Sequence, residues 1–274
     1  SRSDIAERNA GRRRSVVKKA AVAVARWLFT NRAKAAVGLG DLRLAFSGAA
    51  SANPATLEYF SGLDLLIREV YGLSEASGPS VVTREGATRF GSVGSPLPGI
   101  EMRLADNGEI LLRGRSVFPG YLHNDAATQH ALRDGWLHTG DLGVLGSDGL
   151  LTISGRTKDI VITTGGKNIC PRPIEALLRE DPIIVDAVIV GDGYDQLGVL
   201  VAVADGAGPD DQMGQVEVRV AEVNQRFARA EQIRKIGLLP RPLSVADGER
   251  FEDGNVARKV VVERFADQID DLYR

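Results

Sequence analysis

Residues 91–155 form a run of short apolar segments that Gly, Asp and Asn residues interrupt at close intervals, such as EMRLA, EILLRG, WLHTGD and LLTISG. Short segments closed by turn residues predict β-strands. The flanking regions differ, because from Leu42 up to this run, and again after Lys158, strand-like stretches alternate with helix-like ones. The sequence therefore predicts an α/β fold with a small β-rich subdomain, followed by a small α+β domain.

The length of the chain agrees with two domains. It has 274 residues, of which 43% are hydrophobic, enough for one sizeable core and a smaller second one. We place the boundary between the domains at Arg156 to Lys158.

The expected elements follow from periodicity and from turn residues. A strand over 42–46 in an α/β fold needs parallel neighbours, which we do not expect this chain to supply. Ser1 is not a starting methionine, and the chain opens on a charged stretch, so we expect it to be the C-terminal portion of a longer protein. The other predicted elements are helices over 4–37, 54–61, 215–230 and 258–273, a helix after Pro171, and strands at 66–72, near Ile160, at 186–190, at 198–204 and near Ile236.

Charge and cysteine content exclude several classes of protein. The formal net charge of −2 does not suggest a nucleic-acid-binding protein, although residues 1–40 hold ten of the 34 basic residues and two of the 36 acidic ones. Cys170 is the only cysteine, so no intrachain disulfide forms and a cytoplasmic location is expected. The apolar run at 20–25 is far shorter than the roughly 18 residues of a membrane span.

Three segments carry candidate chemistry. In YGLSEASG (71–78) a strand enters a Gly turn that can approach a phosphate, and Glu75 is a hard oxygen ligand suited to Mg²⁺. In DGWLHTGD (134–141) a strand ends at Asp141, whose two oxygens can accept both hydroxyls of a ribose. The string GRTKDIVITTGGKNICPRPIE (155–175) joins basic residues, a Gly-Gly bend and a helix that Pro171 starts.

The order of motifs resembles the C-terminal half of bacterial long-chain acyl-CoA synthetases, members of the adenylate-forming superfamily. The resemblance runs from about Leu42 to the end of the chain. It rests on YGLSEASG, GSVGSPLPG, GEILLRG, FPGYLHNDAAT, DGWLHTGDLG and DGLLTISGRTKDIVITTGGKNICPRPIEALL. It implies that residues 1–156 are the C-terminal part of the large adenylate-binding domain and that 157–274 are the mobile lid domain.

The resemblance also implies a reaction. A carboxylic acid would react with ATP to give an acyl-adenylate and pyrophosphate, the lid would rotate, and CoA would then displace AMP. Neither step needs a protein nucleophile, so catalysis would come from positioning and charge stabilisation.

Individual roles carry over by position. Tyr71 would pack on the adenine, Ser74 would contact the phosphate, Glu75 would hold Mg²⁺, and Asp141 with Arg156 would bind the ribose. Together with the strand-end segment after Ser47, the predicted nucleotide-binding residues are Gly48, Ala49, Tyr71, Gly72, Ser74, Asp141 and Arg156.

The lid motif supplies the remaining roles. Lys158 would be the hinge about which the lid turns, and Gly165, Gly166 and Lys167 would face the CoA tunnel. Cys170 lies in the same motif without a paired histidine, so we interpret it as a small packing residue rather than a nucleophile.

The sequence departs from the family in two places. The Ser/Thr/Gly-rich phosphate loop with its lysine is absent, as is most of the large domain. In the ungapped register of the last helix, Asn255 also stands where the family has the lysine of the adenylation step. An alternative is that Arg258 or Lys259 takes this role after a shift of about one helical turn.

The motif of the CoA-transfer face is therefore kept and that of the adenylation face is altered. Our hypothesis is an acyl-CoA ligase specialised for passing the acyl group of a preformed acyl-adenylate to CoA, with a separate adenylating enzyme as a candidate partner. The acid would be large and apolar, as for long-chain synthetases. The alternatives are an ordinary two-step ATP-dependent synthetase and a non-catalytic adenylate-binding protein.

Overall fold

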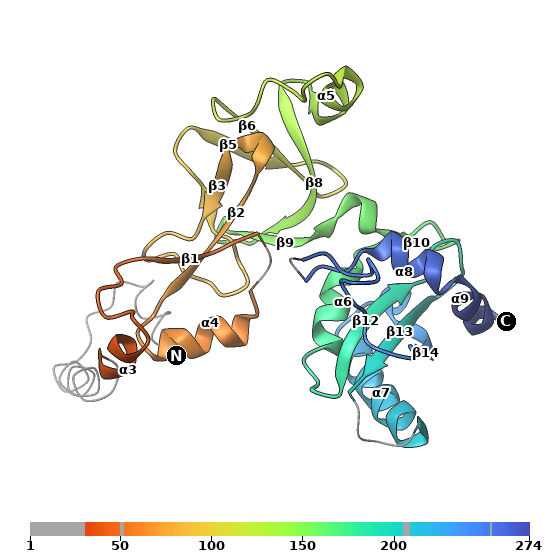
Figure 1. Cartoon of the computed structure of the whole chain (residues 1–274). Helices are drawn as coiled ribbons and strands as arrows, with labels where there is room; N and C mark the ends of the chain where they lie inside the picture. Colours follow the sequence, from red (N-terminus) through yellow and green to blue (C-terminus); the bar gives the residue numbers. More distant parts are fainter. Residues whose placement is uncertain (1–30, 50–51, 205–208, 253) are drawn as a thin grey trace. The chain divides into compact units, whose positions relative to one another are not determined.

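The computed structural model describes residues 31–49, 52–204, 209–252 and 254–274. The chain divides into two compact units, residues 1–153 and 154–274 (Figure 1). The division falls close to Arg156, where the sequence predicts the domain boundary. The predicted fold class is confirmed, since each unit combines helices with β-sheet.

The first sheet of the N-terminal unit has the strand order β1-β2-β3-β4. Strand β1 pairs with β2 in parallel, and the later strands pair antiparallel. The expectation that this chain supplies no parallel neighbour for the first strand is therefore wrong, because β2 takes that place. The elements are α3 (Asn31–Ala36), β1 (Ala45–Ser47), α4 (Pro54–Gly62), β2 (Ile67–Leu73), a 3₁₀ turn (Ser74–Ala76), β3 (Gly78–Val82) and β4 (Ser95–Pro96).

The second sheet is the predicted β-rich subdomain. Its strands run in the order β5-β6-β8-β7, and β9 pairs with β8. Buried apolar side chains from alternate strand positions close its core, among them Ile110, Leu112, Leu137 and Leu151. The elements are β5 (Ile100–Leu104), β6 (Glu109–Gly114), α5 (Asp125–Ala131), β7 (Leu132–Arg133), β8 (Trp136–Leu145) and β9 (Leu151–Arg156).

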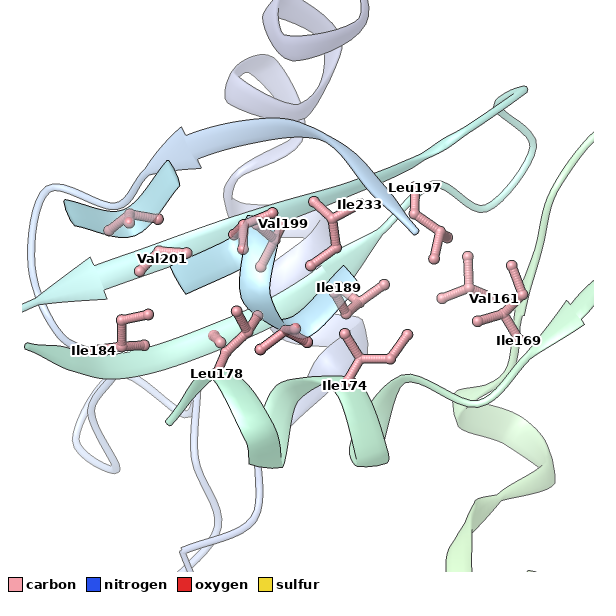
Figure 2. Packing of buried hydrophobic residues seen from close by; sticks show 14 residues of the cluster. Val161, Ile169, Ile174, Leu178, Ile184, Ile189, Leu197, Val199, Val201 and Ile233 are labelled. Atoms are coloured by element: carbon pink, nitrogen blue, oxygen red, sulfur yellow. The ribbon is translucent and has the colours of Figure 1, made fainter. Parts of the chain in front are cut away.

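The C-terminal unit is built on the three-stranded sheet β12-β13-β14. Both faces of this sheet are buried, which explains the nearly unbroken apolar run LGVLVAV of β13. Val199 and Val201 face one hydrophobic cluster together with residues of α6 (Pro171–Leu178) and α7 (Pro209–Asn224) (Figure 2). Leu200 and Ala202 face a second cluster with residues of α8 (Arg258–Arg264) and α9 (Ala266–Tyr273). The strands are β10 (Val161–Ile162), β11 (Asn168–Ile169), β12 (Ile184–Val190), β13 (Leu197–Val203) and β14 (Ile233–Leu238).

Two of the predicted helices of this unit differ in their limits. The helix predicted at 215–230 begins earlier, at a proline suited to a first turn, and ends at Asn224, whose side chain bonds both the backbone N–H and the carbonyl of Ile233. The helix predicted at 258–273 is divided at the buried Phe265. The helices are α6 (Pro171–Leu178), α7 (Pro209–Asn224), α8 (Arg258–Arg264) and α9 (Ala266–Tyr273), and a 3₁₀ turn covers Thr157–Asp159.

Most of the helix predicted over 4–37 lies outside the described residues; within them, only α3 belongs to it. Across the part of the chain that the structure describes, no helix has the length and apolar character that crossing a membrane requires.

Candidate functional site

The predicted phosphate segment lies where β2 turns into β3. Gly72 approaches the carbonyl of Gly78 so closely that a Cβ would stand 1.9 Å from that oxygen, so only glycine fits there. Ser74 and Glu75 follow in the 3₁₀ turn, which ends at Ser77 in the left-handed conformation (φ 61°). These residues thus form a tight turn at the carboxyl end of β2.

The parallel pairing of β1 and β2 brings a second predicted segment to the same edge. Ser47 is the register partner of Glu69 on β2, so the chain leaves β1 at Gly48 and Ala49 near the end at which β2 reaches its turn. Ala49 has a positive φ of 67°, so the chain changes direction there. The carboxyl ends of parallel strands are the usual ligand-binding edge of an α/β sheet.

Tyr71 and Asp141, which are 70 positions apart, meet in the structure. The Tyr71 hydroxyl donates to Oδ2 of Asp141 at 2.8 Å, and both side chains are partly buried. Tyr71 also packs against the core of the β-rich subdomain. Tyr71, predicted on the adenine side, and Asp141, predicted on the ribose side, therefore share one place in the N-terminal unit.

Asp141 follows a segment of β8 that the buried Glu109 holds. Glu109 accepts a hydrogen bond from the backbone N–H of Gly140 at 2.9 Å, and its second oxygen lies 3.0 Å from Nδ1 of His138. Thr139 donates to the carbonyl of Ile110 and accepts the N–H of Asp141. Sequence reasoning assigned no role to Glu109, because nothing in the local pattern of β6 shows which part of β8 it will meet.

Glu75 has a partner that the sequence analysis also missed. The Tyr121 hydroxyl donates to Oε1 of Glu75 at 2.7 Å, and the carbonyl of Glu75 accepts the N–H of Phe118 at 2.8 Å. The hydrogen bond to Glu75, with a smaller effect of burial, raises the pKa of Tyr121. The contact holds the Glu75 carboxylate at the turn.

The predicted CoA residues lie in the Gly-rich hairpin, residues 161–169, formed by β10 and β11. Val161 and Ile169 anchor its base in the core of the C-terminal unit. Gly165, Gly166 and Lys167 are all exposed at its tip, and Gly166 has a positive φ of 71°. The hairpin thus presents backbone and one cation to solvent.

Arg156 and Lys158 belong to the C-terminal unit, whereas Asp141 belongs to the N-terminal one. Arg156 ends β9 and Lys158 lies in the 3₁₀ turn that follows; both are exposed. A hinge residue in a short connecting turn can absorb backbone rotation without disturbing a core.

Asn255 lies in the Asn255 loop, residues 250–256, of which Asp253 is outside the described residues. The loop closes on itself, since the N–H of Phe251 donates to the carbonyl of Asn255 at 2.9 Å. Nη2 of Arg172 lies 3.4 Å from Oδ1 of Asn255. The position that the family resemblance assigns to a lysine therefore has a neutral amide next to a guanidinium from α6.

Ion pairs hold both ends of the Asn255 loop. Arg250 pairs with the buried Asp186 at the start of the loop, and Arg258 pairs with the buried Glu175 after it. Arg258 also donates to the carbonyl of Ile189. The loop is thus tied to the rest of the unit on either side.

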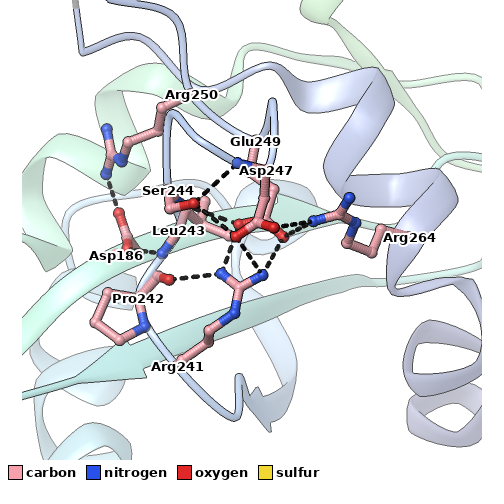
Figure 3. A network of polar contacts seen from close by, with 9 residues as sticks. All are labelled: Asp186, Arg241, Pro242, Leu243, Ser244, Asp247, Glu249, Arg250 and Arg264. Carbon is pink, nitrogen blue, oxygen red and sulfur yellow. Dashed lines mark hydrogen bonds and ion pairs between the residues drawn. The ribbon is translucent and has the colours of Figure 1, made fainter.

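Glu249, the residue before this loop, is the centre of the network in Figure 3. Its side chain is fully buried and accepts bonds from Arg241 at 2.7 and 2.9 Å, from Arg264 at 2.9 Å and from the N–H of Ser244 at 3.0 Å. The bond to Arg241 is the largest of the influences that lower the pKa of Glu249 to about 2.

Cys170 behaves as the packing residue that the sequence predicts. Its Sγ donates to the carbonyl of Ser154 at 3.0 Å and lies against Gly155, where a Cβ would stand only 2.4 Å from the sulfur. Burial raises the pKa of this thiol, which disfavours the reactive thiolate.

Comparison with known proteins shows the family of the chain. Residues 15–122 match the family described as AMP-binding enzyme, and residues 158–274 match the AMP-binding enzyme C-terminal domain. The chain is 39% identical over 266 residues to the long-chain-fatty-acid–CoA ligase FadD15 of Mycobacterium bovis, an alignment that covers 90% of this chain and 44% of the relative. It is 33% identical over 293 residues to the long-chain-fatty-acid–CoA ligase ACSBG2 of Gallus gallus, covering 91% of this chain and 38% of that one.

Solved structures with the same fold include apo MatB from Rhodopseudomonas palustris and an ATP-bound RpMatB-BxBclM chimera, B1. The first is 28% identical with a TM-score of 0.60, covering 84% of this chain and 47% of that one. The second is 26% identical with a TM-score of 0.69, covering 86% and 47%. The chain thus spans less than half the length of these relatives, and it belongs to the adenylate-forming family of AMP-binding enzymes.

Proposed function

We propose that this chain is part of an acyl-CoA ligase that acts on a large apolar carboxylic acid. Two relatives that match about nine tenths of the chain are named as long-chain-fatty-acid–CoA ligases. Members of this family use ATP and CoA as substrates, and we assign the same substrates to the complete protein. We infer the class of the acid, a large apolar carboxylic acid, from the names of these relatives.

In this proposal the N-terminal unit binds the adenylate. Asp141 would accept the ribose hydroxyls, with Tyr71 fixing the orientation of its carboxylate, and Ser74 in the 3₁₀ turn would donate to the phosphate. Arg156 would also bind the ribose, as the family resemblance implies. The strand-end residues Gly48 and Ala49 would line the same pocket at the ligand-binding edge of the sheet.

Glu75 fits Mg²⁺ as a single carboxylate ligand. Mg²⁺ is commonly held by one or two carboxylates together with substrate phosphates rather than by a full protein cage. The described residues contain no group of three or more His, Cys, Asp or Glu side chains that could enclose a metal. The ion would neutralise phosphate charge, and Tyr121 would keep Glu75 oriented toward it.

We further propose that the protein is specialised for the second half-reaction. There the CoA thiol attacks the acyl carbonyl of acyl-AMP, the bond to the phosphate oxygen breaks, AMP leaves, and the thiol proton passes to solvent. The observation that carries this proposal is Asn255, a neutral amide where the family has the lysine of the adenylation step. Lys158 as hinge and the hairpin residues Gly165, Gly166 and Lys167 keep the family pattern.

The contacts around the loop weigh against a substitute from the neighbouring cations. A one-turn shift that brings Arg258 to the position of Asn255 would leave Glu175 buried without its ion-pair partner, at a cost of several kcal/mol. Lys259 is 88% exposed on the side chain and its ammonium lies 3.8 Å from Glu263 in the next turn of α8. Neither residue reaches the loop without rebuilding the start of α8.

One observation favours the ordinary two-step synthetase as a second candidate. Arg172 brings a guanidinium within 3.4 Å of Oδ1 of Asn255, so a cation is present beside the lysine position. If Arg172 supplied the missing charge, adenylation would persist although position 255 holds no lysine. The exposed Glu252 in the same loop would oppose it by repelling the phosphates of ATP.

The test is pyrophosphate exchange and acyl transfer measured separately in the complete protein. We expect N255K to raise the rate of pyrophosphate exchange with the cognate acid about tenfold or more. One charge-stabilising donor changes a rate by roughly 10²–10³-fold, so this gain would be a partial recovery. Transfer from synthetic acyl-AMP to CoA should change little. A larger gain is expected when Glu252 is also neutralised.

Two other results would decide for the alternatives. A wild type that exchanges as fast as N255K, with exchange lost in R172A, would establish the two-step synthetase with Arg172 as its cation. Binding of acyl-AMP without formation of thioester or pyrophosphate exchange would indicate a non-catalytic adenylate-binding protein.

A further inference from the structure

The tip of the Gly-rich hairpin is held by a turn that lies outside the sequence motifs. The turn spans residues 191–194, between β12 and β13, and contacts the hairpin three times. The N–H of Gly193 donates to the carbonyl of Ile162 at 2.9 Å, the N–H of Thr164 donates to the carbonyl of Tyr194 at 2.8 Å, and the N–H of Ile162 donates to Oδ1 of Asp192 at 2.9 Å. Only the last of these uses a side chain.

The turn is itself firmly placed by α9. Tyr194 stacks on Tyr273 with ring centroids 3.8 Å apart and an interplanar angle of 11°, and its hydroxyl donates to Asp270 at 2.7 Å. The Tyr273 hydroxyl lies 3.1 Å from the carbonyls of Val190 and Gln196, on either side of the turn.

The packing around Tyr273 leaves little room for another arrangement. A Cβ on Gly191 or Gly198 would stand 3.0 or 2.9 Å from the Tyr273 hydroxyl. Burial raises the pKa of Tyr273 to about 12, so the hydroxyl stays neutral and available for these bonds. The turn is therefore a rigid support on one side of the hairpin.

The hairpin needs such a support, because its own anchors lie at the base. Val161 and Ile169 are buried in the core, but the tip residues Thr164, Gly165, Gly166 and Lys167 are all exposed. Two internal bonds close the tip, from the N–H of Gly166 to the carbonyl of Thr163 at 2.8 Å and from the N–H of Thr163 to the carbonyl of Lys167 at 3.3 Å. Neither attaches it to the rest of the unit, and glycines at the tip add backbone freedom.

We propose that Asp192 is a positioning residue for the CoA-transfer step, acting by holding the backbone of Ile162 and through it the tip that carries Gly165, Gly166 and Lys167. The proposal rests on the proposed function, in which this tip faces CoA. Asp192 does not touch the substrate; it restricts the hairpin to the pose in which the thiol is delivered.

The experiment compares D192A, D192N and D181A in the complete protein. D192N keeps an oxygen that can accept the N–H of Ile162. Asp181 accepts the N–H of Ile183 at 3.1 Å in the turn after α6, so D181A removes a similar bond in the same unit without touching the hairpin. Amide hydrogen exchange, transfer from acyl-AMP to CoA and pyrophosphate exchange are the readouts.

For D192A we expect faster hydrogen exchange at Ile162 and Thr164 and a roughly three- to tenfold loss of transfer at low CoA concentration, mainly as a higher KM for CoA. Pyrophosphate exchange should not change. D192N should recover most of the loss, and D181A should behave as wild type.

Unchanged amide hydrogen exchange in D192A would show that Asp192 does not hold the hairpin. Faster hydrogen exchange together with unaltered acyl transfer would show that Asp192 has no role in the reaction. A wild type without any transfer would contradict the proposed function instead. The comparison of amide hydrogen exchange would still decide whether Asp192 holds the hairpin.

Discussion

The Gly-rich hairpin and the Asn255 loop are held in the C-terminal unit by different forces. Backbone hydrogen bonds and one exposed carboxylate, Asp192, tie the hairpin to its neighbouring turn. Charged pairs with buried acids tie the loop at both ends. The loop is therefore held firmly at both ends, and in the proposed function Asn255 lies in it where the lysine of the adenylation step would be.

Removing the Glu249 side chain should cause the largest loss of stability, and the Asn255 loop should be the segment most affected. Glu249 is fully buried and receives bonds from Arg241, Arg264 and Ser244, so E249A removes the buried acceptor that two guanidinium groups share. Of their carboxylate partners, Asp247 remains for both. Because both arginines are about two fifths exposed and regain water, we expect a loss of about 2–3 kcal/mol rather than the full cost of a broken buried pair. Chemical denaturation measures this loss, and hydrogen exchange should show the Gly-rich hairpin less affected than residues 250–256.

The same comparison predicts a dependence on pH. The folded-state pKa of Glu249 is about 2, below its ordinary value of 4.5, so its contribution to stability is complete above about pH 4.5 and is lost as the pH falls toward 2. Denaturation midpoints between pH 6 and pH 3 should therefore fall less in E249Q than in the wild type. Equal pH dependence in both proteins would show that other carboxylates cause the loss of stability at low pH.

Asp141→Ala should affect both half-reactions, because both need the adenylate. Hydrogen bonds to a charged group contribute about 1.5–3 kcal/mol, so the affinity for acyl-AMP should fall about tenfold or more. Isothermal calorimetry with a non-reactive acyl-AMP analogue measures it directly. Y71F, which loses the hydroxyl contact to Asp141 but keeps the ring, should give a smaller loss. Unaltered binding in D141A would show that Asp141 is only a structural residue of β8.

Lys167→Ala should give the smallest change in activity. Compared with a substitution next to the Asn255 loop, it should distinguish the role of the Gly-rich hairpin from that of the loop. Lys167 is exposed at the hairpin tip, where a single attraction to a CoA phosphate is worth about 1 kcal/mol or less, so KM for CoA should rise about two- to fivefold. Lys259 is the matched control, exposed on α8 next to the loop, and K259A should alter neither half-reaction. Reduced pyrophosphate exchange in K259A would support the alternative in which Lys259 takes the role of the adenylation lysine after a shift of about one helical turn.

Local patterns predicted most of the fold. The alternation of apolar runs with turn residues places the strands of the β-rich subdomain, and the apolar run of β13 indicates a buried strand. The helix predicted at 215–230 was misplaced because Asn224 bonds the backbone of Ile233, a tertiary contact that no local propensity includes. Pairing partners are likewise non-local, so the parallel neighbour of β1 was missed.

The candidate site was predictable to the extent that its residues belong to motifs. Tyr71 and Asp141 were named from separate strings, and the structure brings them to 2.8 Å. Glu109 and Tyr121 belong to the motif strings GEILLRG and FPGYLHNDAAT, yet the sequence assigned neither of them a role. Like Asp192, which lies outside the motifs, each acts through contacts with residues far along the chain. An isolated polar residue in a sequence carries no signal of which group it will meet.

In the proposed function, the family pattern kept in the Gly-rich hairpin and the neutral Asn255 make transfer and adenylation unequal. The direct measurement is the ratio of two rates in one preparation of the complete wild-type protein: thioester formed from acyl-AMP and CoA, and pyrophosphate exchange with ATP and the same acid. We predict that transfer exceeds exchange by roughly 10² or more, the value of one lost charge-stabilising donor. Exchange as fast as transfer would contradict the account and establish an ordinary two-step synthetase.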